Sequence, residues 1–385
     1  MPATMPPMRT AVISDIHLGL ASRADLLRHE SFRESLIEAT RDVDRLVLLG
    51  DTVEMRDRPL PLTLEIVRPF FEQIGDAFAG REIVLVPGNH DHRLLGPWLD
   101  HIRETTEPLA LDAEVTDPHP CLELFSDWLG KANLRVQYPG IWLRDDVFAT
   151  HGHYVDSHLT LPTVERLAVA AIDRLGGRPT GRRESVRDYE KVHAPVYDLL
   201  FDLAQGDRSM AGGEEGRPTS MRLWELAGGA QGRARTIRGR LFGSAVVPAV
   251  LRGLERAGVG SFGRDFSVAE IGRAGVEAMH VVADRLGINA AHLVFGHIHR
   301  RGPLWGEDGR SALDPPWQRR GLTIHNTGNW LYTPSMMSGA SPGSSPFWPG
   351  SGILIGEQGD PELVELIDPD MVADMEQARF GTKKP

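Results

Sequence analysis

The chain has 385 residues, enough for two or three domains or for one large domain with an insertion. Its 41% hydrophobic and 25% charged residues exclude a mostly disordered or fibrous protein, and the single cysteine, Cys121, excludes a disulfide framework or a cysteine zinc site. The formal net charge of −11 argues against binding of nucleic acid through the whole surface.

Strand-like and helix-like segments alternate in the first part of the chain. Hydrophobic runs at 10–14, 45–49 and 82–86 are typical of buried strands. Segments 23–43 and 62–79 between them mix charged residues with Leu, Phe and Ile, as amphipathic helices do. This order predicts parallel strands covered by helices.

Later strands follow the same order. We expect strands at 146–150, 291–295 and 321–325, and a closing pair at 351–355 and 362–366. Asp, Asn or His residues follow five of the expected strands at the carboxyl end, where open α/β sheets bind their ligands.

Residues 156–289 interrupt this pattern. The segment is rich in Arg and is more basic than the rest of the chain, with arginines clustered at 182–183 and 233–240. We predict a helical insertion with helices at 161–175, 184–205, 219–228, 244–257 and 267–286.

The polar residues that follow the strands form five short blocks. Carboxylate, amide and imidazole ligands without thiolate suit Mn²⁺, Fe or Zn²⁺. Glycines at 50, 88, 152 and 296 let the backbone turn sharply beside them. The blocks are Asp15-x-His17, Gly50-Asp51, Gly88-Asn89-His90-Asp91, His151-Gly-His153 and Gly296-His297-x-His299.

Over residues 10–155 and 291–330, these five blocks in this order resemble the calcineurin-like metallophosphoesterases. The resemblance implies a four-layer αββα sandwich, an α/β fold with two mixed sheets between helices. It also implies hydrolysis of a phosphoester or phosphoanhydride at two divalent metal ions, with Mn²⁺ as the first expectation and Fe or Zn²⁺ as alternatives.

The resemblance also implies a role for each residue of the five blocks. Asp51 would bridge the two metals, His90 would face the phosphate and assist the leaving group, and Asp91 would orient His90. The first metal would be held by Asp15, His17 and His299, and the second by Asn89, His151 and His297.

Within that superfamily, four of the blocks are similar to the UDP-diacylglucosamine pyrophosphatases of lipid A synthesis. The blocks are 14–19, 50–55, 151–156 and 296–300. Those enzymes also carry a helical insertion that covers a lipid substrate, but their third block usually has Arg in place of His90, and their insertion is shorter. A general or cyclic-nucleotide phosphodiesterase and a non-catalytic scaffold remain alternatives, whereas a phosphoprotein phosphatase and a nuclease are disfavoured.

For several neighbouring residues, the sequence leaves two possible roles open. Glu54 and Arg56 follow the bridging residue and could reach substrate or begin a helix. Arg300 could meet a phosphate or form a surface salt bridge, and Asp156 could hydrogen-bond a ligand histidine. His92 and His153 could face substrate or lie in loops, Asn326 and Asn329 could line the site or make turns, and His325 is expected in the core.

We therefore predict a metallophosphoesterase core at 9–155 and 290–368, a helical insertion or lid at 156–289, and tails at 1–8 and 370–385. The basic insertion suits a phosphorylated small molecule or a lipid-linked substrate. No signal peptide is evident, so the expected location is the cytoplasm, with peripheral contact at the inner membrane face as an option. No nucleic acid partner is expected.

Overall fold

The computed structural model describes residues 8–105, 108–117, 119–159, 184–205, 268–307, 315–337 and 343–380. The helices predicted at 161–175, 219–228 and 244–257 lie outside these residues. Within the described part of the chain, no helix combines the length and the apolar character that a membrane crossing requires.

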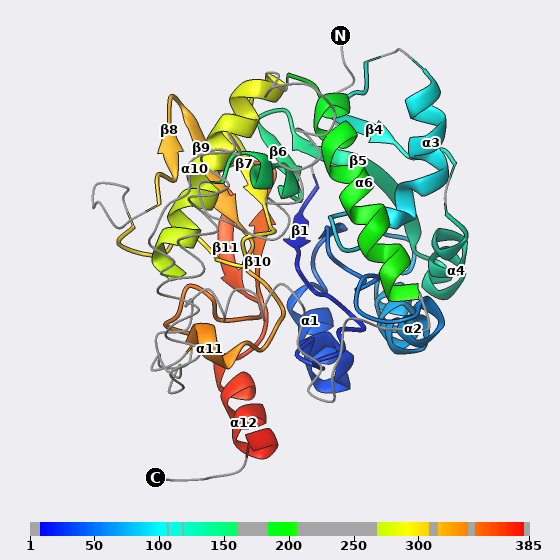
Figure 1. Cartoon of the computed structure of the whole chain (residues 1–385). Coiled ribbons are helices and arrows are strands. Elements are labelled where there is room, and N and C mark those ends of the chain that lie inside the picture. Colours follow the sequence, from blue (N-terminus) through cyan, green and yellow to red (C-terminus); the bar gives the residue numbers. More distant parts are fainter. Residues whose placement is uncertain are drawn as a thin grey trace, which may run out of the picture.

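In the described part of the chain, one large sheet of eleven strands forms the centre (Figure 1). The strands are β1 (Thr10–Ile13), β2 (Arg45–Leu49), β3 (Glu82–Val86), β4 (Asp112–Glu114), β5 (Asn133–Arg144), β6 (Val147–Thr150), β7 (His292–Phe295), β8 (Gln318–Arg319), β9 (Leu322–Asn326), β10 (Ser351–Ile355) and β11 (Glu362–Glu365). Their order in the sheet is β11-β10-β1-β2-β3-β5-β6-β7-β9-β8, and β4 pairs with β5.

The helices surround this sheet. They are α1 (Glu30–Ala39), α2 (Leu60–Ala77), α3 (Gly96–Glu104), α4 (Pro120–Leu129), α6 (Val186–Gln205), α10 (Val268–Leu286), α11 (Pro334–Met337) and α12 (Pro369–Phe380). The described residues also include the short 3-10 helices η1 (Leu26–Arg28), η2 (His92–Leu95) and η3 (His153–Ser157).

The predicted parallel strands are present. β1, β2, β3 and the first part of β5 run parallel, and so do β6, β7 and β9. β10 joins β1 antiparallel and pairs with β11, which is the predicted closing pair. The carboxyl ends of β1, β2, β3, β6 and β7 carry the five polar blocks.

Strand β5, which the sequence patterns did not predict, joins the two halves of the sheet. Its residues 133–136 pair with β3, and its residues 140–144 pair with β6 in the opposite direction. Pro139 lies between these two pairings and Gly140 begins the second, where the strand passes from one half to the other. Such a long, bent strand lets one sheet curl into two layers.

The alternation of side chains shows how the layers stack. In β2, Leu46 and Leu48 belong to the core beneath the helices, whereas Val47 and Leu49 belong to a core shared with Val294 of β7 and residues of β5 and β6. Every position of the strand is therefore buried on one face or the other. The inner core lies between the two strand layers, and the predicted α/β fold with two layers of strands between helices is confirmed.

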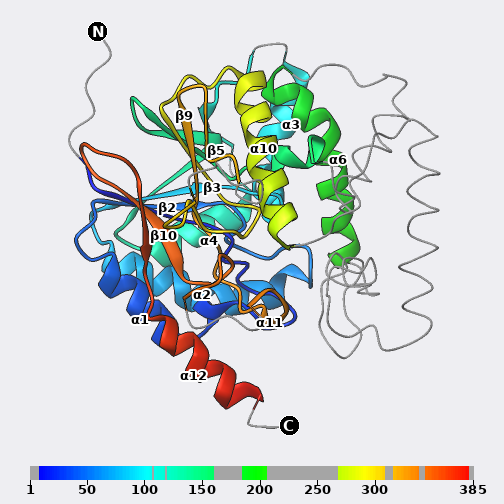
Figure 2. The same ribbon diagram turned by 90° about the vertical axis from the view of Figure 1, so that its left-hand side faces the viewer.

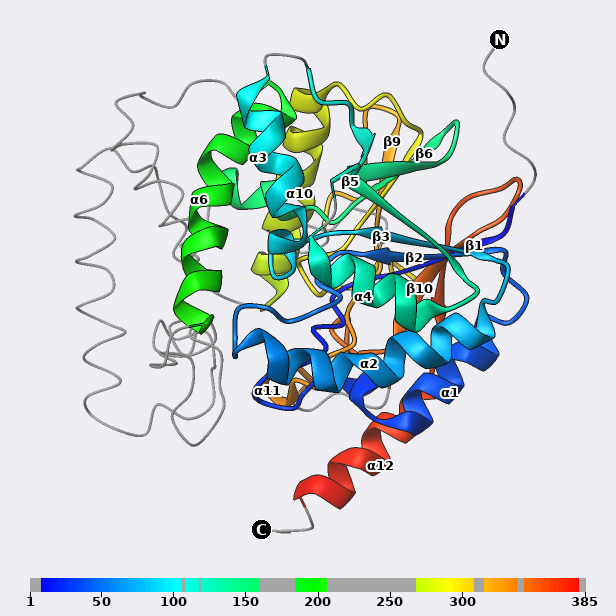
Figure 3. The same ribbon diagram turned by 90° about the vertical axis from the view of Figure 1, so that its right-hand side faces the viewer.

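Helices cover both outer faces of the curled sheet (Figures 2 and 3). α1, α2 and α4 cover one face, where the rings of Phe71 and Phe125 stack with centroids 4.4 Å apart. α10 covers the other face, where Met279 and Val282 share a core with Leu293 of β7. α10 lies within the range predicted as an insertion, yet it packs as part of this helix layer, and the domain boundaries remain a prediction.

The C-terminal segment differs from its prediction. Residues 370–380, expected within a tail, form most of helix α12. Val372 is fully buried in the same core as α1 and α2, and Ser35 of α1 donates a hydrogen bond to the sulfur of Met371 at 3.5 Å. These contacts join the first turn of α12 to the core and to α1.

Gly75 allows the closest approach between α2 and α4. A Cβ atom at this position would lie 2.4 Å from the carbonyl oxygen of Leu129 and 2.5 Å from its Cα. Backbone atoms cannot move aside as a flexible side chain can, so an added methyl group would force the two helices apart.

We therefore expect Gly75→Ala to lower the free energy of unfolding by about 1–3 kcal/mol, despite the better helix propensity of alanine. Gly96→Ala is the matched control, because the nearest atom to its Cβ would be 3.6 Å away, and its stability should be unchanged or slightly higher. Thermal or urea unfolding measures both variants. Equal stability of Gly75→Ala and wild type would contradict the close contact between α2 and α4.

Candidate metal centre

The predicted ligands stand on loops whose backbone is held in an unusual conformation. The described residues include seven non-glycine residues with positive φ, and five of these are predicted ligands. Side chains other than Gly rarely adopt this left-handed region, and such strain gathers at functional sites. The five are Asp15 (φ 54°), His17 (φ 49°), Asp51 (φ 51°), His297 (φ 66°) and His299 (φ 57°).

Glycines let these loops press against one another. A Cβ atom on Gly50, which has φ 84°, would lie 2.3 Å from the imidazole of His151. One on Gly88 would lie 2.4 Å from Oδ1 of Asp51. The spaces that side chains would fill here are occupied by predicted metal ligands, so the glycines are required for the site to close.

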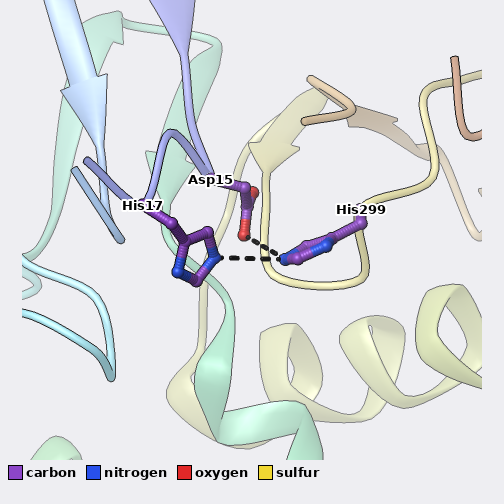
Figure 4. Close-up of side chains that lie close together, drawn as sticks. All are labelled: Asp15, His17 and His299. Carbon is purple, nitrogen blue, oxygen red and sulfur yellow. Dashed lines mark hydrogen bonds and ion pairs between the residues drawn. The ribbon is translucent and has the colours of Figure 1, made fainter. Parts of the chain in front are cut away.

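Asp15, His17 and His299 form the first group of ligand atoms (Figure 4). Oδ1 of Asp15 lies 3.2 Å from Nε2 of His299, and the Nε2 atoms of His17 and His299 are 3.4 Å apart. These are the residues predicted for the first metal, brought together from β1 and from the loop after β7.

Asp51, His151 and His297 form a second group, and Asn89 joins it. Oδ2 of Asp51 is 3.3 Å from Nε2 of His151, and Oδ1 of Asn89 is 3.1 Å from both Nε2 of His151 and Nδ1 of His297. The same Oδ2 of Asp51 is 3.6 Å from Nε2 of His17 in the first group. Asp51 therefore lies between the two groups, as a bridging ligand must.

The outer hydrogen bonds of the histidines place their protons away from this centre. Nδ1 of His151 donates to the carbonyl oxygen of Leu49 at 3.0 Å, and Nε2 of His297 donates to Oδ1 of Asp156 at 3.0 Å. In a neutral imidazole the other ring nitrogen then offers a lone pair. The inward-facing atoms of the second group are thus electron-pair donors, a set that fits a divalent cation.

The amide of Asn89 can face this centre in two orientations. With its NH₂ inward, it donates to His151 and His297, and its oxygen accepts from Nη1 of Arg56 at 3.0 Å. With its oxygen inward, it adds another electron pair to the donors of Asp51, His151 and His297. A bound cation would select the second orientation, because only the oxygen can be a ligand.

Buried charges dominate the electrostatics. Burial alone would raise the pKa of the Asp51 carboxyl, but the charges of His151 and His90 hold it well below its usual range. Burial alone would lower the pKa of His17, but the hydrogen bond with Glu54 and the charge of Asp51 raise it to about 9. Buried carboxylates of this kind need compensating positive charge, which metal ions also supply.

His90 lies beside the two groups and is held by Glu54. Nδ1 of His90 is 2.6 Å from Oε2 of Glu54, and the same oxygen is 3.0 Å from Nδ1 of His17. The main-chain N–H of His90 also donates to Oδ1 of Asp51 at 2.8 Å. Glu54 therefore links a predicted metal ligand to the residue predicted to face the phosphate.

Asp91 does not orient His90, and that predicted role is wrong. Its buried carboxylate instead accepts main-chain N–H groups: Gly88 at 2.6 Å, Thr52 at 2.8 Å, and Asp51 and Val53 at 3.3 Å. The side chain thus points back into the loop that follows β2. Asp91 holds the shape of the loops around Asp51, and Glu54 takes the role that was assigned to it.

Glu54 is the main residue that the sequence patterns left undecided between a substrate contact and a helix start. It is buried and does not begin a helix, since α2 begins at Leu60, and its carboxylate instead contacts His17 and His90. The signal that could have identified it is a glutamate three residues after Asp51, between the apolar residues Val53 and Met55. A charged residue in such a position has to find a buried partner.

The remaining candidates also have defined places. Arg300 contacts Glu307 and lies over the ring of Trp317, so it forms an ion pair. Asn326 donates to the carbonyl of Gly296 at 2.7 Å and Asn329 donates to that of His299 at 2.8 Å, which fixes the last block. Asp156 hydrogen-bonds the predicted ligand His297, which was one of the two interpretations of this residue. His92 and His153 are buried on the side of α6. His325 is buried beside His292.

Comparison with known proteins assigns the chain to a family. The family model of the calcineurin-like phosphoesterases matches residues 8–213, more than half of the chain. The chain belongs to the calcineurin-like phosphoesterase family. Membership supports a phosphoesterase hydrolase, and this family implies divalent metal ions, for which the clusters described above are candidate ligands.

Other comparisons add little. No curated protein matches the chain. One solved structure that it resembles is a dimetal phosphatase from Danio rerio, with 11% sequence identity and a TM-score of 0.33 over 94% of this chain and 100% of that chain. A likeness this weak carries no argument about function.

Replacement of the shared carboxylate tests the metal centre. We expect Asp51→Asn to weaken divalent metal binding by more than the roughly 10–100-fold that loss of an outer hydrogen-bond partner costs. Metal per chain after dialysis, measured by mass spectrometry, should fall below that of wild type. Asp42→Asn is the control, because it removes the same charge from an exposed position. Full metal content in Asp51→Asn would refute the bridging role.

Proposed function

We propose that this calcineurin-like phosphoesterase hydrolyses a phosphodiester or pyrophosphate with two divalent metal ions. The observation that carries the proposal is that two groups of ligand atoms share one carboxylate, Asp51. Asp15, His17 and His299 would hold one ion, and Asn89, His151 and His297 the other. When bound, the pair of ions would supply Lewis-acid activation of the phosphoryl group and of an attacking water.

The chain's own residues orient the reaction. His90, held through Nδ1 by Glu54, would assist departure of the leaving group or stabilise its charge. Arg56 lies on the same loop as Glu54, with its guanidinium 5.7 Å from the ring centre of Tyr197 on α6. With the Asn89 oxygen outward, it accepts a hydrogen bond from Nη1 of Arg56 at 3.0 Å. A guanidinium beside the metal centre would suit a phosphoryl oxygen of the substrate.

For the substrate, we propose a nucleotide-linked or lipid-linked pyrophosphate, as in the UDP-diacylglucosamine pyrophosphatase branch. The four similar sequence blocks support this, and the basic segment 156–289 would act as a lid over a phosphorylated substrate. Mn²⁺ is the proposed metal, and the proposed location is the cytoplasm with peripheral membrane contact. A general phosphodiesterase is the second candidate, favoured by His90 in the position where that branch usually has Arg.

Turnover of a small substrate panel by the Mn²⁺-loaded protein tests this function. The panel holds a phosphomonoester, a phosphodiester, and a sugar-nucleotide pyrophosphate with and without an acyl chain. We expect hydrolysis, and we expect His90→Ala to lower kcat by roughly 10²–10⁴-fold with the metal content retained. His101→Ala, at an exposed position of α3, is the matched control and should keep wild-type activity.

The pattern of turnover distinguishes the candidates. Selective hydrolysis of the acylated pyrophosphate would support the lipid-linked substrate and the lid. Activity on the simple diester alone would favour the general phosphodiesterase. A protein that binds two metal ions and turns over none of the panel would argue for a scaffold and against an enzyme.

A further inference from the structure

Helix α6 carries a buried carboxylate, Glu190, outside the two groups of predicted metal ligands. Glu190 is only 6% exposed, and a carboxylate removed from water has to be compensated by donors. Its Oε1 accepts from the hydroxyl of Tyr138 at 2.5 Å and from that of Tyr154 at 2.6 Å. Its Oε2 lies 2.9 Å from Nε2 of His92. One side chain of α6 therefore collects three buried partners.

These partners stand on segments that carry the candidate site. His92 begins η2, two residues after His90. Tyr154 lies in η3, three residues after His151. Tyr138 belongs to β5, whose partner strand β6 leads directly into His151. Through Glu190, α6 is joined to the loop of His90 and to the loop of His151 at the same time.

The hydrogen bonds of the network have a defined direction. Burial alone would raise the pKa of Glu190, but the charge of His92 and the hydrogen bonds from His92 and the two tyrosines lower it to about 2. An ionised carboxylate only accepts, so Tyr138 donates to it, and the Tyr138 oxygen is left to accept from Nε2 of His153 at 3.0 Å. The ring of His153 lies 5.7 Å from that of His151, between centroids.

The chemistry of this network suits the positioning of loops better than the stabilisation of the folded chain. A buried charge with its partners is often no more stabilising than well-packed apolar residues of similar volume. α6 already has apolar packing of its own, in which Val192, Val196 and Tyr197 form a cluster. A hydrogen-bonded polar network also fixes the arrangement of the groups that it joins, here the loops of the site.

We propose that Glu190 is a positioning residue that holds the loops of His90 and His151 in their reactive arrangement. Helix α6 then helps to shape the site as well as being part of the predicted insertion. The inference rests on the proposed function for its kinetic consequences. It also predicts a consequence that needs no turnover, because the loop of His151 carries a predicted metal ligand.

The test compares Glu190→Gln, which keeps the shape and removes the charge, with wild type. We expect kcat to fall roughly 10–100-fold with KM little changed, as small displacements of reacting groups cause. We also expect Mn²⁺ to bind about tenfold more weakly in a calorimetric titration. Asp202→Asn removes the same charge from an exposed position of the same helix and should match wild type in both measurements.

The outcomes separate the two proposals. Wild-type kcat and wild-type Mn²⁺ affinity in Glu190→Gln, with only a lower unfolding temperature, would reduce Glu190 to a structural role and overturn the inference. If wild type itself shows no turnover, the proposed function fails and the Mn²⁺ titration alone decides: weaker binding upholds positioning, and equal binding overturns it.

A second variant keeps the test decisive if Glu190→Gln does not fold. Tyr154→Phe removes one donor and keeps the ring that stacks on Tyr189 with centroids 4.5 Å apart. The same two measurements apply to this variant. We expect Tyr154→Phe to lose kcat or Mn²⁺ affinity, by less than Glu190→Gln does, and such a loss would support the inference. No loss in either measurement would overturn it.

Discussion

The carboxylate of Asp51 is the group around which the candidate site is arranged. It is almost fully buried, and one of its oxygens contacts His17 and His151 while the other accepts the main-chain N–H of His90. A negative charge in this position is costly unless positive charge surrounds it. The convergence of histidines from separate loops is thus an electrostatic requirement, and a pair of divalent ions would satisfy it fully.

The backbone accepts strain to meet this requirement. Asp51 itself has a positive φ, and so do Asp15, His17, His297 and His299. Strain of this kind persists only where the surroundings over-determine the conformation. Asp91 provides that control around Asp51 through four main-chain hydrogen bonds, and Asn326 and Asn329 do the same for the last block. The buried strands beneath, covered on both faces, give these loops a rigid base.

The parts of the molecule that sequence could predict are the local ones. Hydrophobic runs followed directly by Asp, Asn or His located the parallel strands and the residues now found in the two groups, because strand and ligand are adjacent in the chain. Strand β5 was missed because Pro139 and Gly140 interrupt its pattern; these residues lie where it passes between layers. The roles of Glu54 and Asp91 depend on contacts across loops, which spacing along the chain does not determine.

Helix α6 is the clearest example of contacts that spacing along the chain does not determine. Its range was predicted within two residues at its start, yet nothing in the periodicity of 186–205 indicates that Glu190 faces His92, Tyr138 and Tyr154. These contacts place a helix of the predicted insertion directly on two loops of the candidate site. If substrate selection resides in that insertion, α6 provides a physical route by which the segment that recognises the substrate also sets the geometry of the residues that act on it.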